Sequence, residues 1–177
     1  MTKKYIDAQQ LLDDSYNLGL QILDSGCKPN YIIGVWRGGT PVGIAVQEYL
    51  AFHGVTTDHI AIRTGRYRDE ELDTTKEHVI VDQLEYIIDH ANCDDALLFV
   101  DDVYDTGITI QETIRILGEK MRKNTPRNIK IATPYFKPTR NQTNKVPDFY
   151  IHETDKWLVF PHELRAHSLD EIKQGKG

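Results

Sequence analysis

The sequence predicts an α/β fold in which a mainly parallel central sheet is flanked by helices. Apolar runs typical of buried strands alternate with helical patterns from Tyr31 to Phe136, and this alternation is typical of parallel sheets. Two of the runs pass directly into loops that hold glycine and polar residues, at positions 37–41 and 101–109. Because ligands bind at the carboxyl ends of the strands in such sheets, we expect both loops to meet at one binding edge.

The composition limits the class of protein. The 177 residues fit a single domain, 1–177, that is long enough to bury its own core. The formal net charge of −6 argues against nucleic acid or an anionic membrane as a partner. Cys27 and Cys93 lack metal-type spacing and are too few for a disulfide framework, which favours a reducing, cytoplasmic location. We find neither a signal-peptide core nor an apolar run long enough to span a bilayer.

The first elements alternate as the fold class requires. Residues 6–23 have apolar side chains at helical spacing and predict a helix that packs on the sheet. Residues 31–36 predict a strand, and Pro41 is well placed to begin a helix that continues to Leu50.

The loop between this strand and this helix holds Arg37, Gly38 and Gly39. The glycines allow backbone N–H groups to approach a ligand, and the arginine supplies a permanent charge. The loop lacks the Gly-Lys-Ser/Thr ending of a P-loop, so we interpret it as an anion-binding loop of another kind.

The next segment predicts a hairpin and a short helix. Residues 57–63 predict a strand, and residues 78–81 predict its return strand. The polar, charged segment 64–77 has little periodicity and predicts a flexible loop between them. A short helix is expected at 83–90.

The central motif begins with the apolar run 97–100 and continues into an acidic pair, Asp101 and Asp102. A third carboxylate, Asp105, then two hydroxyl residues and a glycine, leads into a helical pattern at 110–121. Backbone N–H and hydroxyl groups at a helix N-terminus favour a phosphate group. Three carboxylates beside such a cradle indicate a ligand that also carries sugar hydroxyls, a magnesium ion or a proton to be moved.

This motif resembles the ribose-phosphate-binding motif of type I phosphoribosyltransferases. In that family a four-residue apolar strand precedes two acidic residues, two mostly apolar residues and Asp-Thr-Gly-x-Thr, and every key position is met here. A haloacid-dehalogenase motif needs Asp-x-Asp-x-Thr, and the spacing of residues 102–106 does not fit it. The resemblance implies the type I phosphoribosyltransferase fold, with a core at about 1–136, a small C-terminal hood at about 137–177 and the flexible loop at about 64–77.

The resemblance also implies roles for the motif residues. Asp105 is expected to be the catalytic acid/base that handles the proton on purine N7. Contacts with the ribose and the 5′-phosphate are expected from Asp101, Asp102, Val103, Tyr104, Thr106, Gly107, Ile108 and Thr109. Pyrophosphate binding is expected from Arg37, Gly38 and Gly39, because purine-specific members carry Arg-Gly-Gly or Lys-Gly-Gly after the same strand. The family often has a strained or cis peptide there, which would be Trp36-Arg37.

The tail resembles the base-binding hood of 6-oxopurine phosphoribosyltransferases, particularly the short xanthine–guanine and hypoxanthine types. The resemblance implies that Lys137 reaches the purine O6, that Trp157 stacks on the ring and that Leu158 offers backbone groups to the base edge. A cation at O6 selects an oxo over an amino purine, and an indole offers a broad face to a planar base. His162 stands where the short xanthine–guanine enzymes commonly have tryptophan, which leaves the preferred oxopurine open.

The metal and the covering residues follow from the same resemblance. Mg²⁺ is expected as the cofactor, held by Asp101, Asp102 and Glu163 indirectly through water. Tyr67 of the flexible loop is expected to cover the pyrophosphate, although the serine that often precedes this tyrosine is missing. Arg165 is expected to touch the pyrophosphate.

The function implied is purine salvage. The enzyme would convert a 6-oxopurine (hypoxanthine, guanine or xanthine) and 5-phosphoribosyl-1-pyrophosphate to a nucleoside monophosphate and pyrophosphate, as a homo-oligomer (dimer or tetramer). Three alternatives stay open: a transferase for adenine, orotate or uracil, a non-catalytic nucleotide-sensing or RNA-binding regulator, and a sugar-phosphate domain of another chemistry on the same fold.

Overall fold

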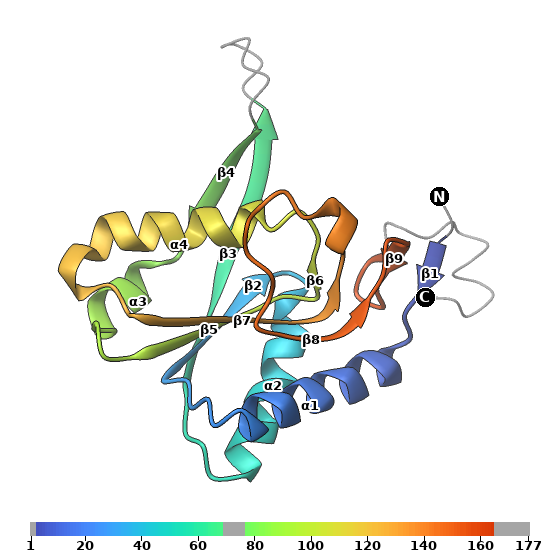
Figure 1. The fold of residues 1–177 in the computed structure, drawn as a ribbon, viewed down its shortest axis with the longest axis horizontal. Helices are drawn as coiled ribbons and strands as arrows, with labels where there is room; N and C mark the ends of the chain where they lie inside the picture. Colours follow the sequence, from blue (N-terminus) through green and yellow to red (C-terminus); the bar gives the residue numbers. More distant parts are fainter. Residues whose placement is uncertain (1–2, 69–76, 165–177) are drawn as a thin grey trace.

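The computed structural model describes residues 3–68 and 77–164. A seven-stranded sheet crosses the molecule in the order β4-β3-β2-β5-β7-β6, and β8 also pairs with β7 (Figure 1). The strands of this sheet are β2 (Tyr31–Trp36), β3 (Asp58–Arg68), β4 (Glu77–Asp82), β5 (Ala96–Val100), β6 (Val103–Tyr104), β7 (Asn128–Phe136) and β8 (Phe149–Glu153). Every pairing in it is parallel except the one between β3 and β4, so the expected mainly parallel sheet is confirmed.

Helices cover both faces of the sheet (Figure 1). They are α1 (Ala8–Asp24), α2 (Gly39–Phe52), α3 (Glu85–His90) and α4 (Ile108–Met121), with short 3₁₀ turns η1 (Arg122–Asn124) and η2 (Pro138–Arg140). One apolar cluster lies under α1 and α2, and a second lies under α3 and α4. The strands between them bury both of their faces, which explains why β5 reads as an uninterrupted apolar run.

The predicted flexible loop at 64–77 is too long at both ends. Residues 64–68 continue β3, where they pair antiparallel with β4 from Thr64↔Val81 to Arg68↔Glu77. Pairing with β4 satisfies this polar backbone, and a polar segment without apolar alternation does not show how far such pairing extends. Residues 69–76 lie outside the described residues.

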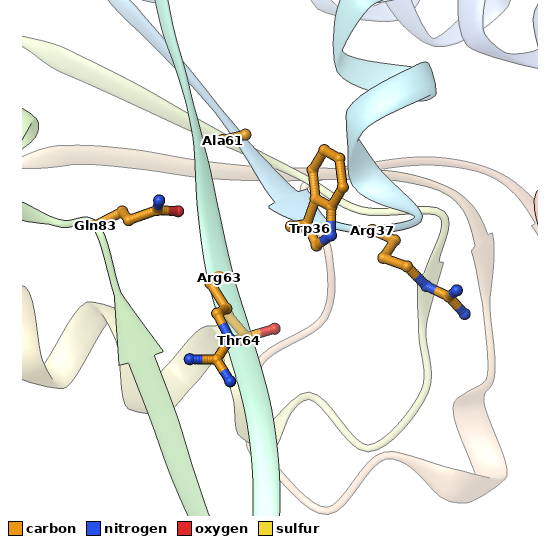
Figure 2. A pocket seen from close by; sticks show the side chains of 6 residues that line it. All are labelled: Trp36, Arg37, Ala61, Arg63, Thr64 and Gln83. Atoms are coloured by element: carbon orange, nitrogen blue, oxygen red, sulfur yellow. The ribbon is translucent and has the colours of Figure 1, made fainter.

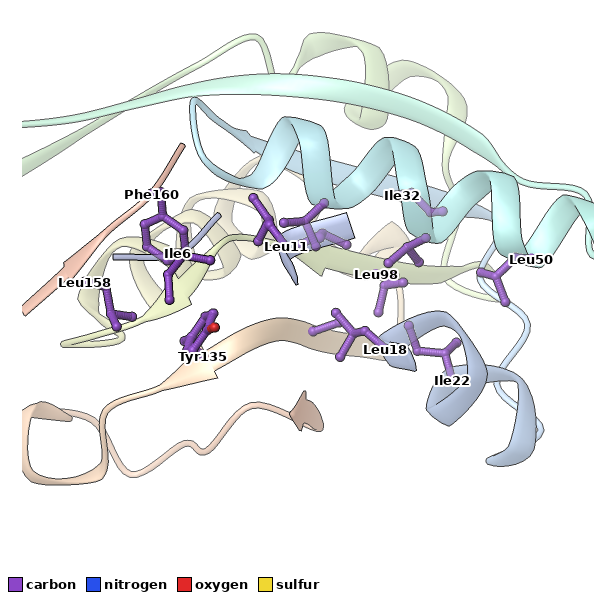
Figure 3. Close-up of a cluster of buried hydrophobic side chains, with 14 of the residues drawn as sticks. Ile6, Leu11, Leu18, Ile22, Ile32, Leu50, Leu98, Tyr135, Leu158 and Phe160 are labelled. Atoms are coloured by element: carbon purple, nitrogen blue, oxygen red, sulfur yellow. The ribbon is translucent and has the colours of Figure 1, made fainter. Parts of the chain in front are cut away.

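A strand near the N-terminus of the chain pairs with a strand of the C-terminal hood. Strand β9 (Trp157–Val159) pairs in parallel with β1 (Lys3–Tyr5) in a separate two-stranded sheet, with Lys4 opposite Leu158. Leu158 and Phe160 are buried in the same apolar cluster as Leu18 of α1, as Figure 3 shows. The hood therefore shares the core of the domain, and the sequence did not predict β1.

A buried polar group ties α1 to the sheet. The carboxylate of Asp14 lies 3.0 Å from Nε2 of His152 on β8 and accepts a hydrogen bond from the Tyr135 hydroxyl on β7 at 3.3 Å. Burial, followed by the charge of Asp14, raises the pKa of Tyr135 above its ordinary value, so that hydroxyl stays a donor. Asp14 itself is 7% exposed.

Replacing this carboxylate tests the contact. We expect Asp14→Ala to lower the free energy of unfolding by roughly 1–3 kcal/mol, because it leaves the buried hydroxyl of Tyr135 without its acceptor. Asp13→Ala is the matched control, because Asp13 is its exposed neighbour on α1 and accepts a hydrogen bond from the Gln9 side chain within the same helix. Thermal unfolding of both variants decides the matter, and equal melting temperatures would contradict the assignment.

Candidate active site

The two ligand-binding loops predicted from the sequence start side by side. Strands β2 and β5 are parallel neighbours, with Gly34 opposite Val100. The glycine loop leaves the carboxyl end of β2, and the acidic motif leaves the carboxyl end of β5. The register therefore brings the two loops to one edge of the sheet, as expected.

The loops interlock because the glycine loop carries no side chain at two positions. A Cβ atom on Gly38 would lie 1.9 Å from Oδ2 of Asp102, and one on Gly39 would lie 2.1 Å from the carbonyl oxygen of Val100. Any other residue would push the loops apart. Helix α2 starts at Gly39, two residues before the predicted start at Pro41. The peptide bond between Trp36 and Arg37 is cis.

Asp101 lies between the two loops. Its carboxylate accepts a hydrogen bond from the backbone N–H group of Asp102 at 2.9 Å. The backbone N–H group of Gly39 also favours the charged form of this carboxylate. Burial first, and then the adjacent Asp102 carboxylate, raises the pKa of Asp101 well above its ordinary value. The site therefore holds a carboxyl group whose charge is disfavoured until a cation or a donor joins it.

Asp102 has a partner that the sequence did not assign to it. Nε2 of His162, from the hood, lies 2.9 Å from Oδ2 of Asp102. The His162 ring stacks on Phe160 with an interplanar angle of 12°, and its Nδ1 is buried with no hydrogen-bond partner among the described residues. The sequence identified His162 only as a departure from the family's tryptophan, because the spacing of 60 residues gives no sign of this contact.

The turn before α4, which the sequence predicts to be a phosphate cradle, starts the helix with a glycine as expected. Gly107 has φ +76° and caps α4, so the chain turns there at a position that suits glycine. The Thr106 side chain is buried, and its hydroxyl oxygen accepts the Ile108 N–H at 3.4 Å. A cavity of about 70 Å³ opens at this helix start and is lined by Asp101, Val103, Tyr104, Asp105, Thr106, Gly107, Thr109 and Ile110.

The buried ring of Tyr104 packs against the turn before α4. Its side chain is 1% exposed, and a Cβ on Gly107 would lie 2.5 Å from its hydroxyl oxygen. That hydroxyl lies 3.1 Å from Oγ1 of Thr143. The phenol ring therefore shapes the turn from within the core, and its glycine neighbour is needed for that close approach.

The hood brings a cation and an aromatic face to Asp105. Nζ of Lys137 lies 3.4 Å from Oδ2 of Asp105 and 6.0 Å from the centre of the Trp157 ring. Lys137 is 6% exposed, whereas Trp157 is 50% exposed, so part of its ring surface is free for a ligand. Leu158 is buried in the core beside them. Arg140, which the sequence did not single out, bonds Oδ1 of Asp105 at 2.5 Å.

Arg37 lines a cavity beside this edge. The cavity measures about 670 Å³ and is lined by Trp36, Arg37, Ala61, Arg63, Thr64 and Gln83 (Figure 2). Figure 2 shows Arg37 and Arg63 extending in different directions from its wall. Arg37 therefore contributes to the wall of a cavity whose lining does not include the cradle residues 105–109.

The other predicted contacts are placed less directly. Tyr67 lies in β3 opposite His78, but its side chain is outside the described part of the structure, as is Arg165. Glu163 accepts the Phe160 N–H at 3.4 Å and so closes a turn of the hood. Within the described ranges, no group of three or more His, Cys, Asp or Glu side chains is arranged to hold a metal ion. No helix there has the length and apolar character needed to cross a bilayer.

Comparisons with known proteins agree with this geometry. A purine phosphoribosyltransferase from Pyrococcus horikoshii Ot3 is 30% identical, with a TM-score of 0.70 over 92% of this chain and 95% of that chain. A xanthine-guanine-hypoxanthine phosphoribosyltransferase from Helicobacter pylori shares the fold at 18% identity, with a TM-score of 0.68 over 98% and 99%. A hypothetical protein from Neisseria gonorrhoeae with bound ppGpp shares it at 17% identity, with a TM-score of 0.77 over 99% and 94%.

No curated protein matches the sequence. The family model for the phosphoribosyl transferase domain matches residues 1–168, which include both loops and the hood strand β9. The chain therefore has the type I phosphoribosyltransferase fold and belongs to the phosphoribosyl transferase domain family.

Proposed function

We propose that this protein transfers the phosphoribosyl group of 5-phosphoribosyl-1-pyrophosphate to N9 of a 6-oxopurine. The observation that carries the proposal is the meeting of Lys137, Asp105 and Trp157 beside the phosphate cradle. A buried cation suits the oxo group at C6, a carboxylate suits the N7 proton, and an open aromatic face suits the planar ring. The purine phosphoribosyltransferase from P. horikoshii, which is 30% identical, supports the same class of acceptor.

The sugar phosphate is assigned to the cradle. Backbone N–H groups at the start of α4 and the hydroxyls of Thr106 and Thr109 hold the 5′-phosphate, because a helix N-terminus favours an anion. Asp101 and Asp102 accept hydrogen bonds from the ribose hydroxyls. The loop of Arg37, Gly38 and Gly39 binds the pyrophosphate through its backbone N–H groups.

In the reaction, N9 forms a bond to C1 of the ribose while the C1–O bond breaks and pyrophosphate leaves with the electron pair. Asp105 takes the proton from N7 as N9 attacks. Lys137 binds O6 and so orients the purine ring relative to the ribose. The hood and its shared core exclude water from the positive charge that develops on the ribose.

Magnesium fits the residues at the edge. Asp101 and Asp102 offer hard carboxylate oxygens, and the raised pKa of Asp101 marks a place where a cation would relieve repulsion. Bound Mg²⁺ would supply charge neutralisation to the pyrophosphate. Glu163 is proposed to act through water.

The acceptor test is direct. The protein is incubated with Mg²⁺ and 5-phosphoribosyl-1-pyrophosphate against hypoxanthine, guanine, xanthine and adenine, and nucleotide formation is followed. We expect turnover with one or more of the oxopurines. Turnover with adenine alone would refute the role of Lys137, and nucleotide binding without turnover of any base would favour a regulator.

The catalytic role of Asp105 predicts a loss of rate. Asp105→Asn should lower kcat by roughly ten- to a thousandfold, the usual range for lost acid–base catalysis. Binding of 5-phosphoribosyl-1-pyrophosphate should persist, because the cradle is built from other groups. The matched control is Asp89→Asn on the exposed side of α3. Turnover at the wild-type rate would remove Asp105 from the mechanism.

Asp101 should make the folded, ligand-free protein less stable as the pH rises. Its pKa is higher in the folded than in the unfolded state, so the folded protein loses stability as the pH rises through the folded pKa. We expect the neutral Asp101→Asn variant to melt higher at pH 7–8, by roughly 2–4 °C for each kcal/mol relieved. This gain in melting temperature should become smaller as the pH is lowered toward about 4, the ordinary pKa of an aspartate.

Thermal scans across this pH range measure the effect, with Asp89→Asn as the neutral-substitution control. The same Asp101→Asn variant should bind 5-phosphoribosyl-1-pyrophosphate more weakly. A melting temperature at or below that of the wild type at every pH would contradict the assignment.

A further inference from the structure

The segment after β7 is fastened to the catalytic motif at both of its ends. The Lys137 N–H donates to the Tyr104 carbonyl at 3.0 Å, and the Gln142 N–H donates to the Thr106 carbonyl at 3.0 Å. The side chain of Thr143 adds the contact with the Tyr104 hydroxyl at 3.1 Å. These bonds flank Asp105 on both sides in the sequence, so the middle of the segment is held beside its side chain.

Arg140 occupies that middle position. It ends η2, and its N–H donates to the Lys137 carbonyl at 3.2 Å, which fixes the turn. Its Nε donates to Oδ1 of Asp105 at 2.5 Å, whereas Nζ of Lys137 lies near Oδ2 at 3.4 Å. Each oxygen of Asp105 therefore has its own cation. The closer contact is the charge-assisted bond from the planar guanidinium.

The two cations are not equivalent with respect to the base. Lys137 lies between Oδ2 of Asp105 and the Trp157 ring, at 3.4 Å from the first and 6.0 Å from the centre of the second. Oδ2 therefore faces the space beside the aromatic surface, and Oδ1 faces η2. A base that draws Lys137 to its O6 would leave Arg140 as the cation that still holds the carboxylate.

The carboxylate of Asp105 needs a partner that fixes its orientation, because the terminal torsion angle of an aspartate side chain has a broad, roughly two-fold energy profile. Thr139, the neighbour of Arg140, bonds Asp155 in the loop before β9 at 2.5 Å, so η2 is also fixed to the hood. Arg140 therefore links the catalytic carboxylate to a turn that is anchored on two sides.

We propose that Arg140 is a positioning residue that fixes Oδ1 of Asp105 and so presents Oδ2 to the N7 proton of the bound base. The inference rests on the proposed function. Arg140 acts through Asp105 and does not itself touch the base. Without Arg140, the Asp105 carboxylate could turn toward Lys137 and form a closer ion pair with it. Oδ2 of Asp105 and the ammonium group of Lys137 would then be engaged with each other and no longer free to bind the base.

The experiment compares Arg140→Ala and Arg140→Lys with the wild type. We expect Arg140→Ala to lower kcat by roughly ten- to a hundredfold, since misplacing a reacting group by about 1 Å can cost a hundredfold. The KM for 5-phosphoribosyl-1-pyrophosphate should change by roughly twofold or less, because the cradle is intact. Arg140→Lys should recover part of the loss, and added guanidinium ion should raise the rate of Arg140→Ala.

A double variant separates positioning from a structural effect. In an Asp105→Asn background, Arg140→Ala should cause little further loss, because residues that act as a unit are not additive. The matched control is Arg127→Ala, which removes an exposed pair with Asp94 at the opposite end of β7. An unchanged kcat in Arg140→Ala, or the same loss in the Asp105→Asn background, would overturn the proposal.

A crystal structure of Arg140→Ala gives a readout that does not depend on activity. We expect the Asp105 carboxylate to be rotated toward Lys137, and an unchanged orientation would overturn the positioning role. An inactive wild type would refute the proposed function, whereas the orientation of Asp105 in the variant would still decide the role of Arg140.

Discussion

The close approach of two loops is the constraint on which the site depends. Gly39 lies against the Val100 carbonyl and Gly38 lies against the Asp102 carboxylate, at distances that leave no room for a Cβ atom. This contact places the backbone N–H groups of the first loop next to the acids of the second. It also brings the backbone N–H group of Gly39 to where it favours the charged form of Asp101. The proposed pyrophosphate and ribose sites are therefore parts of one structure.

The acids of this structure are controlled by different surroundings. Asp101 is partly buried beside another carboxylate. Desolvation and that neighbouring charge raise its pKa and make it a place where a cation is favoured. Asp102 is held by His162 from the hood, and Asp105 is bracketed by Lys137 and Arg140. The hood thus reaches two of the three acids. The apolar cluster under α1 also buries Phe160, on which the His162 ring stacks.

The local parts of the site were predictable, because each one is a short pattern with a physical cause. The Asp-Thr-Gly turn before α4 and the Arg-Gly-Gly turn before α2 are confirmed where the sequence placed them. The boundaries of β3 and the pairing of β1 with β9 were not predicted. The extension of β3 runs through a polar segment that shows no periodicity, and β1 depends on a partner strand that is remote in the sequence.

The sequence by itself determined the α/β class, the two loops and the order in which they follow their strands. These features can be predicted because apolar periodicity and glycine positions reflect local backbone geometry, which residues close in the sequence determine. Only the tertiary structure decided which side chains hold the acids. His162 is 60 residues from Asp102 and Arg140 is 35 from Asp105. Such contacts arise from packing between the hood and the sheet edge, and no local spacing records them.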